Sequence, residues 1–219
     1  MPSPTPRPDD PTTNSSHPQA GAPTVLKIVI AGGFGAGKTT AVGAVSEIPP
    51  LSTEEYLTEA SADVDCLAGL ASKRTTTVAF DFGRLSLPGA PIPLELFLFG
   101  TPGQDRFVDL WYDLSRGAVG AVVLVDTRRL ESSFTPVSFF EDIDLPFVVA
   151  VNQFDGAHRY HPEQVRTALE LPASVPVVTC DARDPNHVAG VLLTLVDHAV
   201  NNAVASRAGH SPSTTLQDA

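Results

Sequence analysis

The feature that most constrains the fold is a glycine-rich segment directly after an apolar run. Residues 32–39 read Gly-Gly-Phe-Gly-Ala-Gly-Lys-Thr, and residues 25–31 before them have the composition of a buried strand. This is the pattern GxxxxGK[ST], in which successive backbone N–H groups converge on phosphate oxygens. A helix is expected over residues 39–46, and its N-terminus adds partial positive charge at the same point. The segment predicts a strand, phosphate loop and helix that bind a nucleotide, rather than an ordinary glycine-rich turn.

Two side chains of this loop have distinct predicted roles. Lys38 reaches the outer phosphates, which makes it a candidate both for binding and for catalysis, and the hydroxyl of Thr39 is a candidate Mg²⁺ ligand. The other loop positions are predicted to line the nucleotide: Gly32, Gly33, Phe34, Gly35, Ala36, Gly37 and Thr40.

Composition narrows the class of protein. The 219 residues are 42% apolar, which suits one α/β domain with a substantial core. A net charge of −11 argues against nucleic acid as a partner, because nucleic-acid binding needs basic patches. Two cysteines, Cys66 and Cys180, fit a reducing compartment. No signal peptide, transmembrane span or lipidation motif is recognisable, so a cytoplasmic protein without direct membrane insertion is expected.

Composition also divides the chain into three parts. Residues 1–23 are crowded with Pro, Ser, Thr and Asp and are predicted to form a disordered N-terminal tail. Residues 206–219 have the same character and predict a disordered C-terminal tail. In between, residues 24–205 alternate apolar β-rich runs with helical patterns, which is typical of a layered α/β domain.

The expected fold of this central part is a three-layer α/β P-loop domain. Its sheet has six mostly parallel strands, with one antiparallel strand made by a short hairpin turn at residues 88–91. A last helix begins after Asp184, with Pro185 in its first turn. The strands are expected at residues 24–31, 77–87, 94–100, 119–126, 147–152 and 175–180. The apolar stripe of the last helix is Val188, Val191, Leu192, Leu195 and Val196.

The end of the fifth strand offers a base-recognition segment, Asn152-Gln153-Phe154-Asp155. A carboxylate here can accept both N–H groups on the Watson–Crick face of guanine, whereas adenine has no such donor pair. The sixth strand ends near Ala182 and Arg183, where the N–H of Ala182 meets the base oxygen in this interpretation. Taken alone, the segment is equally compatible with a surface turn rich in Asn and Asp.

The third strand ends at a candidate hydrolytic segment, Gly-Thr-Pro-Gly-Gln-Asp at residues 100–105. Gly103 is expected to present its N–H to a γ-phosphate, and Gln104 to orient the attacking water. Thr77, four residues before Asp81, is a candidate second Mg²⁺ ligand. Without the phosphate loop, the simpler interpretation of Gln104 as an exposed loop residue would be favoured.

These segments occur in the order and spacing of the Ras-like small GTPases, so the chain resembles that family over residues 24–205. In that family's terms, Thr77 matches the switch I threonine, Gln104 the switch II glutamine and Asp155 the guanine-selecting acid. Ala182 falls on the alanine of the family's Ser-Ala-Lys motif. Three segments look like the actinobacterial GTPases of conserved four-gene "conservon" operons, which are similar to bacterial gliding-motility polarity GTPases: residues 99–105, 123–129 and 179–184.

The resemblance implies a bacterial regulatory switch. Such a protein binds Mg²⁺ and GTP, hydrolyses GTP to GDP and phosphate slowly without an activator, and shows its nucleotide state through switches I and II. Implied partners are a Roadblock/LC7-type regulatory protein and a sensor-kinase-like membrane protein, so membrane contact would be indirect.

The chain departs from the family at two positions. Gly100 stands where most small GTPases carry an Asp that holds Mg²⁺ through water, although the polarity GTPases also lack it. Gln153 replaces a Lys whose stem packs over the base and whose ammonium braces the phosphate loop. Weaker binding of metal and nucleotide is therefore expected.

Arginines raise a separate question, because small GTPases need a positive charge in the transition state. Arg74 is a candidate catalytic residue supplied in cis, and the alternative is a solvated switch arginine. Arg106, Arg128 and Arg129 are expected to be surface or structural charges.

An apolar stripe with helical spacing follows switch II. Part of it is expected in the core, and the remainder, Trp111 in particular, is a candidate partner surface that changes with the bound nucleotide. The stripe consists of Phe107, Leu110, Trp111 and Leu114.

Two alternatives to a GTPase switch stay open. One is a guanine-nucleotide-dependent binding module with negligible hydrolysis, which the glycine at position 100 favours. The other is a P-loop kinase or ATPase, in which Asn152 and Asp155 would be coincidental.

Overall fold

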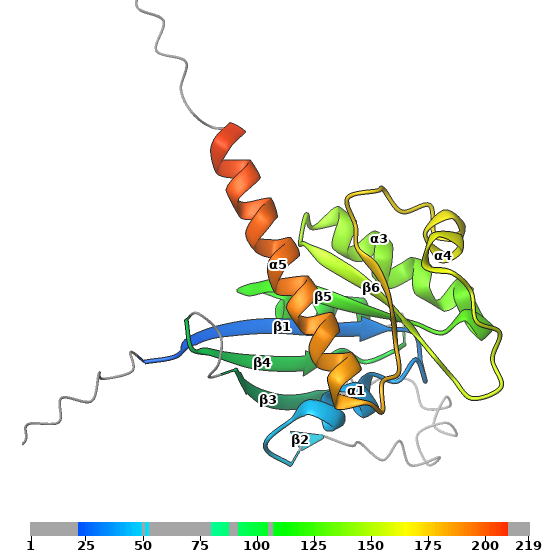
Figure 1. Ribbon diagram of the computed structural model, residues 1–219, viewed down its shortest axis with the longest axis horizontal. Helices are drawn as coiled ribbons and strands as arrows, with labels where there is room; N and C mark the ends of the chain where they lie inside the picture. Colours follow the sequence, from blue (N-terminus) through cyan, green and yellow to red (C-terminus); the bar gives the residue numbers. More distant parts are fainter. Residues whose placement is uncertain (1–21, 50, 53–79, 88–91, 105–106, 210–219) are drawn as a thin grey trace, which may run out of the picture.

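The computed structural model describes residues 22–49, 51–52, 80–87, 92–104 and 107–209. They form a twisted sheet between two layers of helices (Figure 1). This arrangement confirms the predicted three-layer α/β fold.

The sheet contains all six predicted strands and one short additional strand. Its order is β2-β3-β4-β1-β5-β6-β7, with β3 alone running against its neighbours. The extra strand, β2, has two residues at the sheet edge and was not predicted. Residues 77–79 of the predicted second strand lie outside the described residues. The strands are β1 Thr24–Gly32, β2 Leu51–Ser52, β3 Asp81–Leu87, β4 Leu94–Gly100, β5 Ala118–Val125, β6 Phe147–Asn152 and β7 Val177–Cys180.

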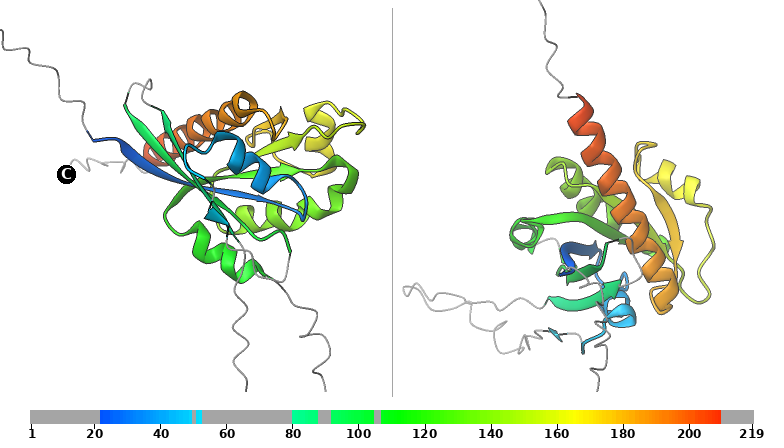
Figure 2. Two further views of the ribbon diagram at one scale, coloured as in Figure 1. Left: turned by 90° about the horizontal axis from the view of Figure 1, so that it is seen from below. Right: turned by 60° about the vertical axis from the view of Figure 1, so that its left-hand side comes forward.

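Helices cover both faces of the sheet. Helices α1 and α5 pack on one face, and α2 and α3 pack on the other (Figure 2). A 3₁₀ segment, η3, leads from β5 into α3. The helical elements are α1 Lys38–Val45, α2 Val108–Ser115, η3 Thr127–Ser133, α3 Phe134–Asp142, α4 Pro162–Ala168 and α5 Pro185–Gly209.

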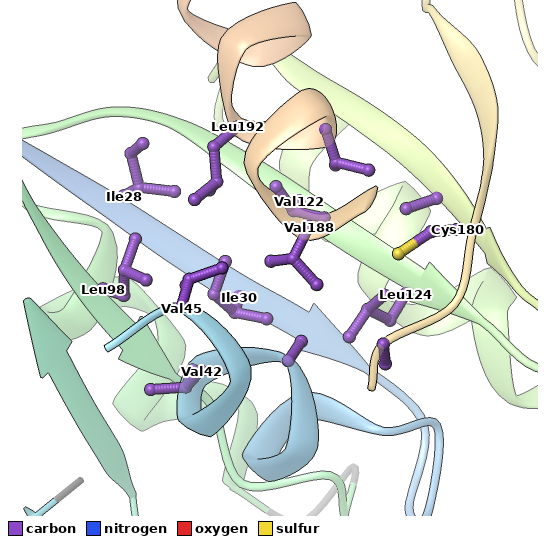
Figure 3. Packing of buried hydrophobic residues seen from close by; sticks show 14 of the residues in the cluster. Ile28, Ile30, Val42, Val45, Leu98, Val122, Leu124, Cys180, Val188 and Leu192 are labelled. Atoms are coloured by element: carbon purple, nitrogen blue, oxygen red, sulfur yellow. The ribbon is translucent and has the colours of Figure 1, made fainter. Parts of the chain in front are cut away.

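Each face of the central strands fills its own core. In β1, Ile28 and Ile30 face α1 and α5, whereas the intervening Val29 faces α2 and α3. Because side chains alternate along a strand, a segment covered on both faces must be apolar at every position, as residues 28–31 of β1, 121–125 of β5 and 147–151 of β6 are. Figure 3 shows the first core, where Val42 of α1 and Leu192 of α5 meet the strands.

Helix α5 begins as predicted and is longer than predicted. The Oδ1 of Asp184 accepts the N–H of Asn186 at 2.8 Å, which satisfies a free donor at the helix start. The helix continues to Gly209, beyond the predicted boundary at residue 205. Length and composition alone would let Pro185–Arg207 cross a membrane, with mean hydropathy 1.4, but the stripe from Val188 to Leu195 is in the core.

The prediction that Trp111 forms a partner surface is wrong. The side chain is 1% exposed, packs against Phe139, and donates its indole N–H to the carbonyl of Pro102 at 3.1 Å. Tertiary packing determines the burial of Trp111, because α2 directs its largest apolar side chain toward the sheet. The exposed aromatic on α2 is Tyr112.

The first prediction concerns adjacent leucines of α5. Leu192→Ala is expected to lower the free energy of unfolding by about 2–5 kcal/mol, because it empties space in a closed core. The matched control, Leu193→Ala, removes a side chain that is 49% exposed and should change stability by less than about 1 kcal/mol. Urea unfolding measures both. Equal losses would contradict the assignment of faces.

Candidate nucleotide-binding site

The predicted site residues that the structure describes lie together at the carboxyl ends of the parallel strands. The loop after β1 and the ends of β4, β6 and β7 all meet there, which is where α/β sheets bind ligands. A separate hollow of about 790 Å³ lies at the opposite end, beside Leu26, Val119 and Val196, and no residue of the phosphate loop lines it.

The phosphate loop has the backbone that its glycines permit. Gly37 caps α1 with φ +105°, and a Cβ at this position would lie 2.5 Å from Nδ2 of Asn152. Only glycine satisfies both the left-handed conformation and the close approach. Lys38 and Thr39 then begin α1, so the helix N-terminus faces the interior of the loop.

Lys38 is held inside the loop. Its ammonium donates to the carbonyls of Gly32 and Gly33 at 2.9 Å each, and the side chain is buried. Burial lowers the pKa of Lys38 to about 8, and the carboxylate of Asp81 partly opposes the shift. The charge of Lys38 is thus partly destabilised until an anion lies beside it.

Asp81 is a site residue that the sequence did not reveal as one. It lies on β3 directly opposite Gly100 of β4, and its buried carboxylate Oδ2 accepts the hydroxyl hydrogen of Thr39 at 2.7 Å. A Cβ on Gly100 would lie 3.1 Å from both Cβ and Oδ2 of Asp81. The glycine therefore leaves room for a carboxylate from the adjacent strand.

A signal for Asp81 was present in the sequence. An expected acid is missing at Gly100, and an aspartate stands on the strand predicted to pair with it. These two observations become connected only through the register of the hairpin, which places Asp81 opposite Gly100. Register depends on the turn, and residues 88–91 lie outside the described residues.

Gly103 lies against the phosphate loop. A Cβ there would lie 2.5 Å from the Nζ of Lys38 and 2.9 Å from the backbone nitrogen of Phe34. No larger residue fits without moving the loop. Gln104 follows and is exposed, with its carbonyl accepting the N–H of Phe107 at 3.0 Å.

Asn152 joins the base-recognition segment to the phosphate loop. Its side-chain Nδ2 donates to the carbonyl of Ala36 at 2.9 Å, and its Oδ1 accepts the N–H of Ala182 at 3.0 Å. Asn152 is buried, so both bonds are protected from water. One amide thus fixes the ends of β6 and β7 relative to the loop.

Asp155 is exposed and paired. Both of its carboxylate oxygens accept hydrogen bonds from the guanidinium of Arg183, at 2.7 and 3.0 Å. These bonds lower the pKa of Asp155. Gln153, the other polar residue of the segment, accepts a hydrogen bond from Arg159 through its Oε1.

A buried carboxylate, Asp126, organises two arginines beside the loop. Arg128 donates to both of its oxygens at 2.9 Å and stacks over the ring of Phe154, 3.7 Å from the centroid. Hydrogen bonds from Arg128, and secondarily from Arg129, hold the pKa of Asp126 below its usual range. These contacts assign both arginines a structural role, as expected.

Arg129 also contacts the phosphate loop. Its Nη2 lies 3.3 Å from Asp126 and 2.9 Å from the position that a Cβ on Gly35 would take. The loop therefore has a neighbouring cation in Arg129, whereas Gln153 is uncharged. The sequence contained no signal for this contact.

Four residues named from the sequence lie outside the described residues. They are Cys66, Arg74, Thr77 and Arg106. The predictions for Arg74 as a catalytic arginine and Thr77 as a metal ligand therefore remain predictions.

The fold and the loop together define a P-loop nucleotide-binding protein with a G-domain-like fold. Comparison with family models matches residues 30–202 to the family described as "Conserved hypothetical ATP binding protein", and the chain belongs to this family. Among solved structures it is similar to the G domain of the T. maritima FeoB iron transporter, with a TM-score of 0.54 and 17% identity, covering 82% of this chain and 99% of that one. No curated protein matches the chain.

The second prediction concerns pH. In the free protein Lys38, with a pKa of about 8, loses its proton as the pH rises, whereas bound phosphates favour its charged form. Nucleotide affinity should therefore be constant below about pH 7.5 and fall above pH 8, by at most about tenfold per pH unit.

Calorimetry at pH 7 and pH 9, in buffers of different ionisation enthalpy, measures the proton taken up on binding. Lys38→Arg is the control, because arginine stays charged while the titration of the nucleotide itself is unchanged. Equal proton uptake by the two proteins at pH 9 would contradict the assignment to Lys38.

The third prediction concerns Arg129. Arg129→Gln should weaken the binding of GDP and ADP alike, by about fivefold, the effect of roughly 1 kcal/mol between unit charges about 4 Å apart in water. Arg116→Gln is matched in charge and lies at the opposite end of β5, so it should have no effect. Equal affinities for Arg129→Gln and the wild type would mean that Arg129 only holds Asp126.

Proposed function

We propose that this protein is a guanine-nucleotide switch that hydrolyses GTP to GDP and phosphate. The observation that carries the proposal is the double hydrogen bond of Asn152, to Ala36 and to Ala182. Through it, the segment that ends in Asp155 and the phosphate loop are held as one surface. One nucleotide can then bind with its phosphates in the loop and its base at the ends of β6 and β7.

The preference for guanine rests on Asp155. An ionised carboxylate only accepts hydrogen bonds, and guanine presents two adjacent donors, N1–H and the 2-amino group. Adenine presents an acceptor, N1, at the equivalent edge, which would face the carboxylate unfavourably. A site built for the donor pair rejects the base that lacks it, because its polar group is left unpaired.

The phosphate side suits Mg²⁺. Thr39 contributes a hydroxyl and Asp81 a buried carboxylate, already hydrogen-bonded to each other, and oxygen donors are what Mg²⁺ prefers. The ion, when bound, would neutralise charge on the phosphate oxygens. Thr77 is the proposed further ligand.

Hydrolysis would depend on positioning. Gly103 lies beside Lys38, and the exposed Gln104 follows it, so the amide is free to orient a water molecule near the outer phosphate. Such sites turn over slowly until a positive charge is added, which is the role proposed for Arg74 or for an activator. In this proposal, partners such as a Roadblock/LC7-type protein read the nucleotide state in the cytoplasm.

An adenine-nucleotide protein is the second candidate. Two observations favour it: the description of the family names ATP, and Arg183 already occupies both oxygens of Asp155. In such a protein Asp155 would make no contact with the base, and its substitution would not change base preference.

The fourth prediction is a single-turnover hydrolysis assay with GTP and ATP in Mg²⁺. The wild type should turn over GTP selectively, and Gln104→Leu should slow the step by about 10²-fold, because the water loses its orientation. Asp81→Asn should raise the Mg²⁺ concentration needed for half-maximal rate, because the site loses its negative charge. Asp113→Asn, an exposed carboxylate on α2, is the control.

The outcomes separate the candidates. Equal turnover of ATP would overturn the preference for guanine. Tight GTP binding with negligible turnover would favour the binding module over the hydrolase.

A further inference from the structure

We propose that Arg183 is an intramolecular competitor for guanine, which holds the carboxylate of Asp155 in the nucleotide-free protein and keeps only Asp181 when the base binds. The inference rests on the proposed preference for guanine and adds a residue that sets its strength. It concerns the β7–α5 turn, whose backbone Asn152 holds in place.

The first ground is the geometry of the pair. Nη1 of Arg183 donates to Oδ2 of Asp155 at 2.7 Å, and Nη2 donates to Oδ1 at 3.0 Å. This is the two-pronged arrangement in which both carboxylate oxygens are used at once. No second ligand can bind the carboxylate in the same way while Arg183 remains.

The second ground is the chemistry of the donors. A guanidinium presents two parallel N–H groups on nitrogens that share one carbon. The N1–H and 2-amino groups of guanine have the same connectivity, and adenine has no such pair. Arg183 therefore mimics the edge of guanine that Asp155 is proposed to recognise, and the two must exclude each other there.

The third ground is a second carboxylate that can retain the arginine. Nε and Nη2 of Arg183 donate to the two oxygens of Asp181 at 2.9 and 2.8 Å. Asp181 is fixed by the backbone N–H of Arg183, which donates to its Oδ1 at 3.0 Å. When guanine takes Asp155, Arg183 loses two bonds and keeps two.

The exposure of the pair sets the size of the effect. The side chains of Asp155 and Arg183 are 80% and 55% exposed, so their ion pair is worth little in water. The expected penalty on guanine binding is about twofold to fivefold in affinity. Guanine can still displace Arg183, since the phosphate loop contributes to nucleotide binding at the same time. GDP should nevertheless dissociate faster from the wild type than from a protein without Arg183.

The test measures the affinities of GDP and ADP for the wild type, Arg183→Ala, Asp181→Asn and the double variant at low salt. Arg183→Ala should bind GDP about twofold to fivefold more tightly with ADP unchanged. Asp181→Asn should bind GDP more weakly, since a displaced Arg183 has no other carboxylate. The double variant should behave as Arg183→Ala does.

Arg159→Ala is the matched control. It removes a neighbouring exposed positive charge whose guanidinium bonds Gln153 rather than Asp155, so it should not tighten GDP binding. Raising the salt concentration should narrow the difference between the wild type and Arg183→Ala, because salt screens exposed ion pairs. Unfolding midpoints of the variants verify that the fold is unchanged.

Two results would overturn the inference. GDP binding to Arg183→Ala that is unchanged or weaker would mean that Arg183 does not compete, or that it contacts the nucleotide. An effect of Asp181→Asn that persists in the double variant would mean that Asp181 acts without Arg183. The variant Asp155→Asn tests the proposed function separately from this inference. If Asp155→Asn leaves the ratio of GDP to ADP affinity unchanged, the proposed preference for guanine fails as well.

Discussion

The site depends on the buried amide of Asn152. Its bonds to the carbonyl of Ala36 and the N–H of Ala182 connect three segments that are far apart in the chain. Losing the amide would leave two buried backbone groups unpaired, at about 1–3 kcal/mol each. The close approach of Asn152 also explains why position 37 must be glycine. The phosphate loop and the segment proposed to recognise the base are thus held together by packing, before any nucleotide binds.

Two charges near the phosphate loop come from residues that the sequence did not point to. Asp81 places a carboxylate opposite Gly100, where the resemblance leads to the expectation of an acid, and Arg129, after β5, places a cation beside Gly35 of the loop. Each charge lies in space that a glycine leaves open. Gly100 leaves room for the carboxylate of Asp81, and Gly35 leaves room for the guanidinium of Arg129. The electrostatic needs of a phosphate site fix where charge must lie, but not which strand supplies it.

The same distinction explains how far the sequence predicted the structure. The loop, six strands and the start of α5 at Asp184 follow from local patterns, because backbone conformation and alternation are local properties. The contacts of Asp81 and Arg129 require register and loop placement, which no local pattern contains. Trp111 was misassigned for a related reason: a helical stripe gives a face, and only packing against Phe139 decides how much of that face is buried.

An acidic chain must still bind an anion. With a net charge of −11, the protein as a whole repels a nucleotide, but in physiological salt that field is screened beyond about 8 Å. Lys38 lies inside the loop and Arg129 lies beside it. Burial lowers the pKa of Lys38, whereas Arg129 is held in place by the buried carboxylate of Asp126. Arg183 is paired instead with Asp155, the acid proposed to recognise the base. Under the proposed function, the cations at the loop would act on the phosphates and Arg183 would act at the base, so substitutions at the two places would change overall affinity and base preference separately.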